Sequence, residues 1–413
     1  MAKKVADQLV DTLEKAGVRR IYAVTGDSLN EVNEAVRKNG RLRWIHVRHE
    51  ETGAYAAAAE AQLTGELACC AGSSGPGHVH LINGLYDAQR SGARVLAIAS
   101  TIPSREFGTE YFQETNTIKL FDDCSYYNQV ATTPEQFPRM LQGAMQAAIS
   151  SCGVGVIGLP GDLAAENATA GLSSTFSFPT RQRVCPAEQE IRELADLLNN
   201  AKKVTLYCGI GAKDAHPELV QLAKYEKVRE NLRSAAAVRG KEEKIQPEYV
   251  ISVVDELSSD DAIFTVDTGM TCVWGARYLQ ATGMRKMLGS FNHGSMANAM
   301  PQAIGAALAY PGRQVVALCG DGGISMLLGD LATIVQYHLP IKLIVFNNRS
   351  LGMVKLEMEV AGLPDWQTTM LNPDFARVAL SMGMAGYNVI NPDDVFPTLQ
   401  KVFNADGRPW LTS

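Results

Sequence analysis

The sequence predicts an α/β protein in which two domains, each with a parallel sheet flanked by helices, enclose an incomplete Rossmann-like middle domain. Three observations support this fold class. Short β-branched runs alternate with amphipathic helical patterns over residues 1–165, the same alternation returns over residues 245–413, and the stretch between them holds one strand-like run. With 413 residues, of which 46% are hydrophobic, the chain is long enough for two or three domains.

The first domain, residues 1–165, is predicted from apolar residues that recur every three or four positions in helices and run together in buried strands. Helices are expected at 5–15, 28–38 and 52–63, and strands at 21–24, 67–71, 95–100 and 154–159. Because strands that alternate with helices favour crossover connections, we expect a parallel sheet covered on both faces.

In the middle of the chain, residues 166–244, strand-like and helical runs no longer alternate regularly. Residues 166–186 are rich in Ser, Thr and Ala and are predicted to be a linker. Within residues 187–244 we expect a strand at 204–208, a turn at Gly209 and Gly211, a helix at 217–223 and a charged helical stretch at 224–244. One strand cannot bury its own apolar face, so residues 187–244 are interpreted as the remnant of a domain that lacks roughly 100 residues.

The last domain, residues 245–413, repeats the alternation of the first. A helix is expected at 247–257, and strands are expected at 262–266, 315–318 and 341–346. The pattern stops in what reads as a final strand, so we expect this domain to be incomplete at its C-terminus.

Composition excludes several classes of protein. The chain carries 38 basic and 44 acidic side chains, a net charge of −6, which argues against a nucleic-acid partner. The sequence has no apolar run of about 18 residues and no signal-peptide pattern at its start. The eight cysteines form no Cys-x-x-Cys pair and mostly lie in apolar runs, which is typical of reduced thiols. We therefore expect a cytoplasmic protein.

The sharpest motif is Gly320-Asp321-Gly322-Gly323, which directly follows a predicted strand, while Asn347-Asn348 ends the next one. Both motifs should reach the carboxyl edge of neighbouring parallel strands, where open α/β sheets bind ligands. A carboxylate, an amide oxygen and a nearby backbone carbonyl suit Mg²⁺, so the candidate ligands are Asp321, Asn348 and Ser350. Gly320, Gly322 and Gly323 let backbone N–H groups approach a diphosphate.

These residues resemble the thiamin-diphosphate-binding signature of the thiamin-dependent decarboxylase and oxidase superfamily, and the resemblance covers nearly the whole chain. It implies that both outer domains are of the thiamin-diphosphate-binding type. Glu50, in Arg48-His49-Glu50-Glu51, matches the acid that bonds the aminopyrimidine ring of the cofactor. Such a carboxylate favours the imino tautomer, whose basic nitrogen activates the thiazolium carbon.

Other landmarks of the superfamily appear in order. The resemblance implies that the following residues contact or support the cofactor: Thr25, Gly26, Gly75, Asn83, Thr268, Gly269, Gly294, Ser295 and Met296. Met296 matches the apolar side chain that keeps the cofactor bent. The bend is needed because the ring nitrogen must reach the thiazolium carbon of the same molecule.

Within the superfamily the chain is most similar to the pyruvate oxidases, in particular the bacterial pyruvate:quinone oxidoreductases. The similarity is carried by residues 23–30, 111–115 and 289–302. It implies that Phe112 and Gln113 lie beside the substrate and that Glu357 lies near the reacting carbon. Gly209 and Gly211 match the first turn of the FAD-binding domain of that family, which this chain lacks in large part.

The implied activity is oxidative decarboxylation of pyruvate to acetate and carbon dioxide, with thiamin diphosphate and Mg²⁺, and with electrons passing through FAD to a quinone. The resemblance also implies a homotetramer with sites shared between subunits, and a peripheral contact with the inner face of the membrane through a C-terminal segment. One alternative is an acetolactate synthase-type carboligase. Another is a non-catalytic relative, against which the presence of Glu50, Asp321 and Asn348 argues.

Overall fold

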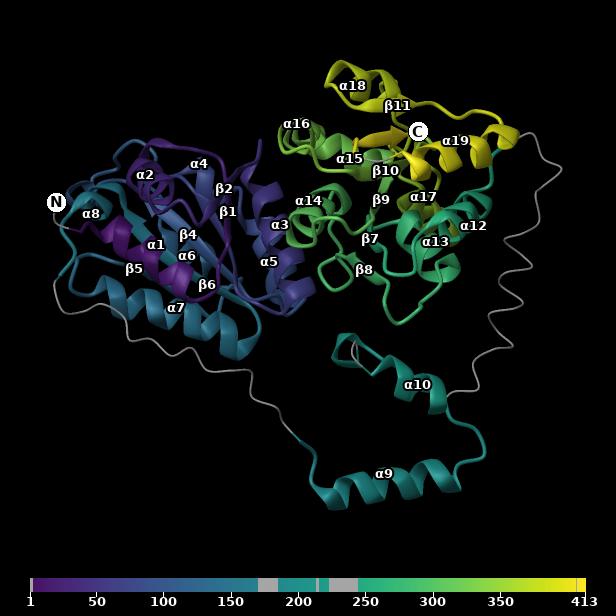
Figure 1. Ribbon diagram of the computed structural model, residues 1–413, viewed down its shortest axis with the longest axis horizontal. Helices are drawn as coiled ribbons and strands as arrows, with labels where there is room; N and C mark the ends of the chain where they lie inside the picture. Colours follow the sequence, from purple (N-terminus) through teal and green to yellow (C-terminus); the bar gives the residue numbers. More distant parts are fainter. Residues whose placement is uncertain (1–2, 170–184, 213–214, 223–243, 406) are drawn as a thin grey trace.

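The computed structural model describes residues 3–169, 185–212, 215–222, 244–405 and 407–413 (Figure 1). It contains two six-stranded sheets, with the strand orders β2-β1-β3-β4-β6-β5 and β11-β12-β10-β9-β7-β8. Neighbouring strands in both sheets run parallel. The α/β class with two parallel sheets flanked by helices is confirmed.

The elements of the first sheet and its helices follow one another along residues 5–165. They are α1 (Val5–Lys15), β1 (Arg20–Ala23), η1 (Asp27–Leu29), α2 (Asn30–Asn39), β2 (Arg43–His46), α3 (Glu50–Thr64), β3 (Ala68–Gly72), α4 (Pro76–Val79), α5 (Ile82–Arg90), β4 (Val95–Thr101), η2 (Ser104–Glu106), α6 (Thr117–Phe121), β5 (Tyr127–Val130), α7 (Phe137–Ser151), β6 (Val154–Pro160) and α8 (Gly161–Ala165).

The second sheet and its helices occupy residues 247–412. They are α12 (Pro247–Leu257), β7 (Ile263–Val266), α13 (Met270–Tyr278), β8 (Lys286–Gly289), α14 (Ala299–Ala309), β9 (Val315–Gly320), α15 (Asp321–Met326), η4 (Leu328–Asp330), α16 (Leu331–Gln336), β10 (Ile341–Phe346), α17 (Gly352–Val360), α18 (Phe375–Ser381), β11 (Ala385–Tyr387), α19 (Pro392–Asn404) and β12 (Trp410–Thr412).

The two sheets share one apolar core. Alternate residues of each strand point to opposite faces, so each sheet packs helices on both sides. On its outer face the first sheet packs against α1, α2 and α7, and on its outer face the second sheet packs against α12 and α19. Between the sheets, α3 and α5 of the first domain meet α14 of the last domain in a single buried cluster (Figure 1).

The contact between α3 and α14 depends on small side chains. A Cβ atom at Gly305 in α14 would collide with the carbonyl oxygen of Ala56 in α3. At the far end of α3, Arg20 donates a hydrogen bond to Glu60, at 2.7 Å, and another to the carbonyl oxygen of Leu308. The two domains of one chain therefore pack helix against helix at close range.

The middle region departs from prediction. Residues 204–208, which the structure describes, form no strand, and the side chain of Tyr207 is fully exposed. A β-branched run needs neighbouring strands to pair with, and the described middle residues offer none. The region contains α9 (Glu188–Asn200), η3 (Ile210–Ala212) and α10 (His216–Leu222), and no residue of α9 is buried. Most of the predicted linker and charged stretch lies outside the described residues.

Within the described ranges, no helix is both long enough and apolar enough to cross a membrane.

Candidate functional site

A cleft opens at the carboxyl ends of β7, β9 and β10, the edge of the sheet where the sequence predicted a site. It brings together most of the residues predicted in the last domain: Thr268, Gly269, Met296, Gly320, Asp321, Gly322, Gly323, Asn348 and Ser350. Each follows a strand end or an adjacent turn, so the parallel topology alone explains their convergence. Gly294 and Ser295 directly precede Met296 in the chain.

Asp321, the first residue of α15, is buried and fixed by three hydrogen bonds. Its Oδ1 accepts the backbone N–H of Gly322 at 2.9 Å, and its Oδ2 accepts the N–H of Arg349 and the side-chain amide of Asn372, each at 2.7 Å. Burial raises its pKa above the usual range of an aspartic acid, which an adjacent cation would oppose. Asn372, which also bonds Asn347 at 2.9 Å, was not identified from the sequence.

The donors around Asp321 fit a magnesium ion. Asn348 projects into solvent at the rim of the cleft and accepts the N–H of Ser350 at 3.0 Å through its amide oxygen. The Oγ atom of Ser350 is buried without a hydrogen-bond partner in the structure. Carboxylate, amide and backbone carbonyl oxygens are hard ligands that suit Mg²⁺, and the carbonyl is the ligand predicted at Ser350. The unpartnered hydroxyl of Ser350 is a further oxygen that a bound group could use.

Asp267 directly follows β7 and bonds the start of α14 and the end of β9. Its carboxylate accepts the backbone N–H groups of Ala299 and Gly320, at 3.0 and 3.1 Å. Burial raises its pKa to about 7. A Cβ atom at Gly323 would collide with its Oδ2, so only glycine fits there. Asp267 directly precedes Thr268 and Gly269 in the chain.

Glu50 is the first residue of α3, at the edge of the first sheet. It is 8% exposed, and its Oε2 lies 2.9 Å from Nδ1 of His80. His49 caps the helix by accepting the N–H of Glu51 at 3.3 Å. His49, Glu50 and His80 are close enough together to hold a metal ion, but Glu50 and His80 already bond each other and the ring of His49 stacks on that of His80.

Asn83 of α5 connects the two domains beside Glu50. Its amide donates to Glu51 at 2.8 Å and to Oγ of Ser295 at 3.0 Å, while its oxygen lies 2.8 Å from Nε2 of His293. Ser295 belongs to the last domain and precedes Met296 of the cleft. The Asn83–Ser295 contact thus links the predicted pyrimidine half of the site to the predicted diphosphate half.

Gln113 lies against the glycine turn of the first domain. Gly75 has a positive φ of 63°, and a Cβ atom on it would approach that of Gln113 to 2.8 Å. Gln113 also accepts a hydrogen bond from Ser74 at 2.8 Å. Gly26 packs against Ser73 of the same turn, and Thr25 lies next to it, exposed. The turn therefore gathers the first-domain residues Thr25, Gly26, Gly75 and Gln113.

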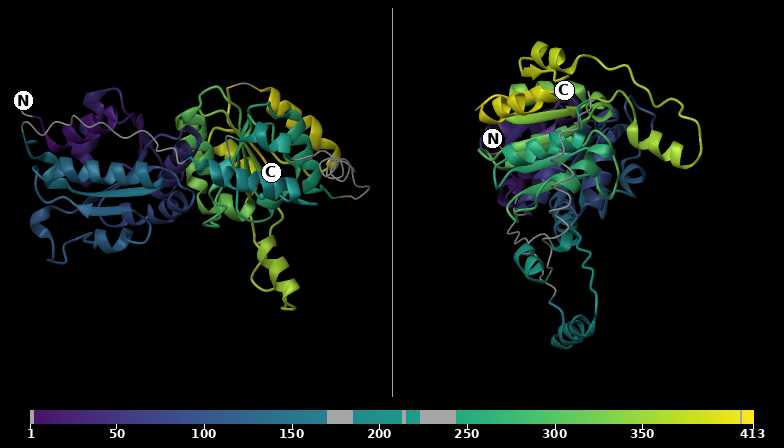
Figure 2. Two further views of the ribbon diagram at one scale, coloured as in Figure 1. Left: turned by 90° about the horizontal axis from the view of Figure 1, so that it is seen from below. Right: turned by 90° about the vertical axis from the view of Figure 1, so that its right-hand side faces the viewer.

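Two predicted substrate residues are not brought into this arrangement. Phe112 is 77% exposed. Glu357 lies on α17, which has no buried residue and projects away from the second sheet (Figure 2). The roles that the resemblance implies for Phe112 and Glu357 stay predictions.

The described residues do not fit FAD. Gly209 and Gly211 have no atom within 4 Å of the position of a Cβ, so they are not close to another backbone or side chain. The segment before them is not a strand, and without a strand, a tight turn and a helix there is no Rossmann cradle for a pyrophosphate. A flavin contact at Gly209 and Gly211 stays a prediction, which the resemblance implies for a middle domain that this chain lacks in large part.

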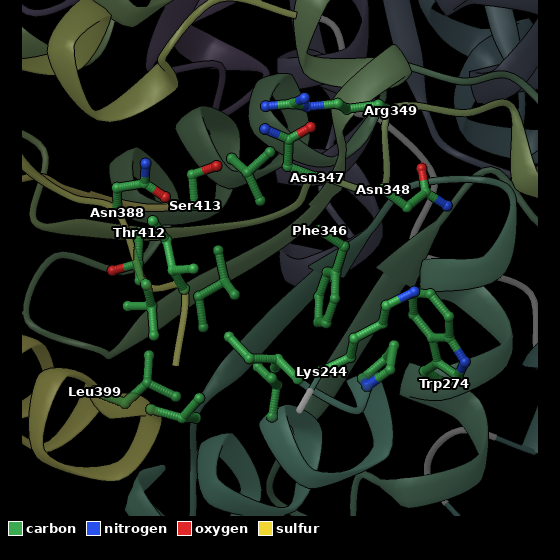
Figure 3. Close-up of a pocket in the computed structure, with 18 residues that line it drawn as sticks. Lys244, Trp274, Phe346, Asn347, Asn348, Arg349, Asn388, Leu399, Thr412 and Ser413 are labelled. Atoms are coloured by element: carbon green, nitrogen blue, oxygen red, sulfur yellow. The ribbon is translucent and has the colours of Figure 1, made fainter. Parts of the chain in front are cut away.

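A second, larger pocket of about 640 Å³ adjoins the cleft (Figure 3). Its walls are mostly apolar and come from β10, β12, α12 and α19, with Asn347, Asn348 and Arg349 along one side and Thr412 and Ser413 along another. Trp274 and Phe346 line both the pocket and the cleft. Sequence reasoning did not identify this pocket, because its lining comes from segments far apart in the chain.

The fold is that of a two-domain α/β protein with a glycine-rich cleft at the carboxyl edge of its second sheet, where open parallel sheets bind ligands. Comparison with known families agrees. The N-terminal TPP binding domain of thiamine pyrophosphate enzymes matches residues 3–120, and the C-terminal TPP binding domain matches residues 267–411. The chain belongs to the thiamine pyrophosphate enzyme family, thiamine pyrophosphate being another name for thiamin diphosphate.

Three relatives illustrate the range of the family. The chain is 31% identical to the putative thiamine pyrophosphate-containing protein YdaP of Bacillus subtilis, over 98% of this chain and 91% of the relative. It is 28% identical to a pyruvate oxidase of Lactiplantibacillus plantarum (92% and 83%) and 25% identical to acetolactate synthase 2 of Zea mays (99% and 85%). These alignments span 500 positions or more, so each relative has residues without a counterpart in this chain of 413.

Proposed function

We propose that this protein decarboxylates pyruvate with thiamin diphosphate and Mg²⁺. The observation that carries the proposal is the Asn83–Ser295 hydrogen bond. Asn83 also bonds Glu51, the neighbour of Glu50, and Ser295 directly precedes Met296, which lines the cleft. This chain of contacts supports a site to which Glu50 and the cleft both contribute. A single cofactor molecule has one end that needs a carboxylate and another that needs a cation, and this chain carries residues for both. In the homotetramer that the resemblance implies, the two halves of one site would come from two copies of the chain.

Each half of the arrangement has a distinct role. Asp321, Asn348 and Ser350 would hold Mg²⁺, and the backbone N–H groups of the Gly320–Gly323 turn, with Thr268 and Gly269, would bind the diphosphate. Glu50 would hold a proton at the aminopyrimidine ring, and Met296 would support the middle of the cofactor. Thiamin diphosphate, when bound, supplies a carbon nucleophile and an electron sink for decarboxylation. Gln113, on the glycine turn, would bind the 2-keto acid through its amide.

The fate of the two-carbon product separates two candidates. The sequence around Phe112 and Gln113 resembles that of the pyruvate oxidases, which supports oxidation to acetate with a quinone acceptor. The described residues form no FAD site, so oxidation would need an electron acceptor supplied from outside them. Acetolactate synthase-type carboligation is the alternative, and the relative from Zea mays supports keeping it in the test.

The proposal is tested with the purified protein, pyruvate, thiamin diphosphate and Mg²⁺. We expect carbon dioxide release that requires both cofactors, and reduction of ferricyanide or a quinone analogue if oxidation follows. Acetolactate without dye reduction would select carboligation, and no carbon dioxide at all would refute decarboxylation. An absorption spectrum of the purified protein shows directly whether flavin is bound.

Glu50→Gln should reduce turnover by at least about 100-fold, because a proton-transfer group typically contributes 10²–10⁴-fold. The matched control is Glu66→Gln, an exposed glutamate just beyond the other end of the same helix. Equal activity in both variants would contradict the role assigned to Glu50. The homotetramer, the cytoplasmic location and a peripheral membrane contact remain predictions, to be tested by light scattering and by sedimentation with vesicles.

A further inference from the structure

Asp330 of the last domain bonds the chain on both sides of Glu50. Its Oδ1 accepts the backbone N–H of Arg48 at 2.8 Å, and its Oδ2 accepts the hydroxyl of Thr52 at 2.7 Å. A third hydrogen bond, from Thr333 at 2.7 Å, fixes the carboxylate itself. Asp330 is 1% exposed, so these bonds form in a setting where losing one leaves a buried polar group unpaired.

The residues after Asp330 extend the same contact along β2. The hydroxyl of Tyr337 accepts the N–H of His46 at 2.6 Å and donates to the carbonyl oxygen of Trp44 at 3.2 Å. The guanidinium of Arg48 donates to Gln336 at 2.7 Å. Because β2 is an edge strand of the first sheet, its outer backbone groups need partners, and the last domain supplies them.

The segment that makes these contacts begins in the cleft. Asp321 is the first residue of α15, and α15, η4 and α16 follow with one residue between α15 and η4. A short, nearly continuous helical run therefore connects the proposed metal ligand to the carboxylate that bonds Arg48 and Thr52. Its length fixes how far the Asp321 turn lies from the start of α3.

We propose that Asp330 is a positioning residue. Its hydrogen bonds to Arg48 and Thr52 fix the position of the Glu50 carboxylate relative to the cleft of Asp321, so that packing of the two domains holds Glu50 where it can act on the cofactor. This inference rests on the proposed function for its effect on turnover. The competing explanation is that Asp330 merely holds the domains together. The structure offers a control for that explanation at the far end of α3, where Tyr310 of the last domain donates a hydrogen bond to the carbonyl oxygen of Leu63 at 3.1 Å.

The first experiment needs no cofactor. Backbone hydrogen–deuterium exchange is measured by mass spectrometry on cofactor-free wild type, Asp330→Asn, Thr52→Val and Tyr310→Phe. We expect residues 46–52 to exchange about tenfold faster in Asp330→Asn, and measurably faster in Thr52→Val, with no change there in Tyr310→Phe. Unchanged exchange at 46–52 in both Asp330→Asn and Thr52→Val would overturn the inference. If Asp330→Asn does not fold, Thr52→Val decides, since it removes only one hydroxyl.

The second experiment separates positioning from binding. Turnover should fall by about 10- to 100-fold in Asp330→Asn, a loss expected when a reacting group is displaced by about 1 Å. The dissociation constants of Mg²⁺ and thiamin diphosphate should change less than about threefold, because the Asp321 cleft stays intact. The double variant Glu50→Gln/Asp330→Asn should be no slower than Glu50→Gln alone, since residues that act as one unit are not additive.

The outcomes of the two experiments are distinguishable. Additive losses, or weakened cofactor binding that accounts for the whole fall in turnover, would show that Asp330 is structural only. A wild type without cofactor-dependent turnover would refute the proposed function, while the exchange measurement would still report whether Asp330 orders residues 46–52.

Discussion

Gln302 of α14 donates a hydrogen bond to the carboxylate of Asp87 in α5, across 3.3 Å at the boundary between the two domains. Both side chains are fully buried. A carboxylate in such a place is costly to ionise, and burial raises the pKa of Asp87 to about 6, with the hydrogen bond from Gln302 partly opposing the shift.

The titration of Asp87 makes stability depend on pH in a defined direction. Its pKa in the folded protein lies above the value of 3.8 for an unperturbed aspartic acid, so the folded state binds more protons between these two values. The contribution of Asp87 to stability is therefore complete below about pH 4 and is lost as the pH rises through about 6. We expect this loss to be on the order of 2–3 kcal/mol. Thermal unfolding of cofactor-free wild type and Asp87→Asn at pH 4.5 and 7.5 measures it. The Tm of Asp87→Asn should fall less between pH 4.5 and 7.5 than the Tm of the wild type. An equal fall in the two proteins would contradict the prediction.

The close approach of α3 and α14 makes Gly305 sensitive to the smallest added side chain. Gly305→Ala places a methyl group against the carbonyl oxygen of Ala56, and we expect destabilisation of about 1–3 kcal/mol despite the higher helix propensity of alanine. Gly211→Ala is the control, because no atom lies within 4 Å of its new Cβ. Differential scanning calorimetry should show a Tm lower by several degrees for Gly305→Ala and nearly unchanged for Gly211→Ala. The reverse order would mean that the domains do not pack as described.

Asn348 should contribute to magnesium affinity. Replacing it with alanine removes an amide oxygen at the rim of the cleft, and we expect Mg²⁺ to bind at least about tenfold more weakly, the lower end of losses seen even for outer partners of a metal site. Titration with Mg²⁺ in the presence of thiamin diphosphate, followed by calorimetry, measures the change. Asn388→Ala, in the adjoining pocket but outside the cleft, should bind Mg²⁺ as the wild type does. A normal affinity in Asn348→Ala would remove Asn348 from the metal site.

The central strands could be predicted from the sequence, and the edge strands could not. β3, β4, β6 and β9 are buried on both faces and therefore read as uninterrupted apolar runs. β2, with the sequence Arg-Trp-Ile-His, lies at an edge and is half polar, so it gave no signal. Residues 204–208 were predicted to form a strand and do not. A β-branched composition cannot show whether a neighbouring strand exists.

The candidate site, too, could be predicted from the sequence only in part. Asp321 and Asn348 could be paired from the sequence, since each follows a strand and neighbouring parallel strands end at one edge. Contacts such as Asn83 with Ser295 and Asp330 with Arg48 join segments more than 200 residues apart, and no local pattern encodes them. Asp267 can also be recognised from the sequence, because an aspartate directly after a buried strand is well placed to bond the neighbouring turn.

The absence of any buried residue in α9 has an evolutionary consequence. The two outer domains recognise each other through α3, α5 and α14, and α9 takes no part in that recognition. A connecting segment of this kind can tolerate insertions and deletions, because no packed side chain of the outer domains depends on it. Changes in the length or composition of this segment are therefore expected to leave the contacts of α3, α5 and α14 in place.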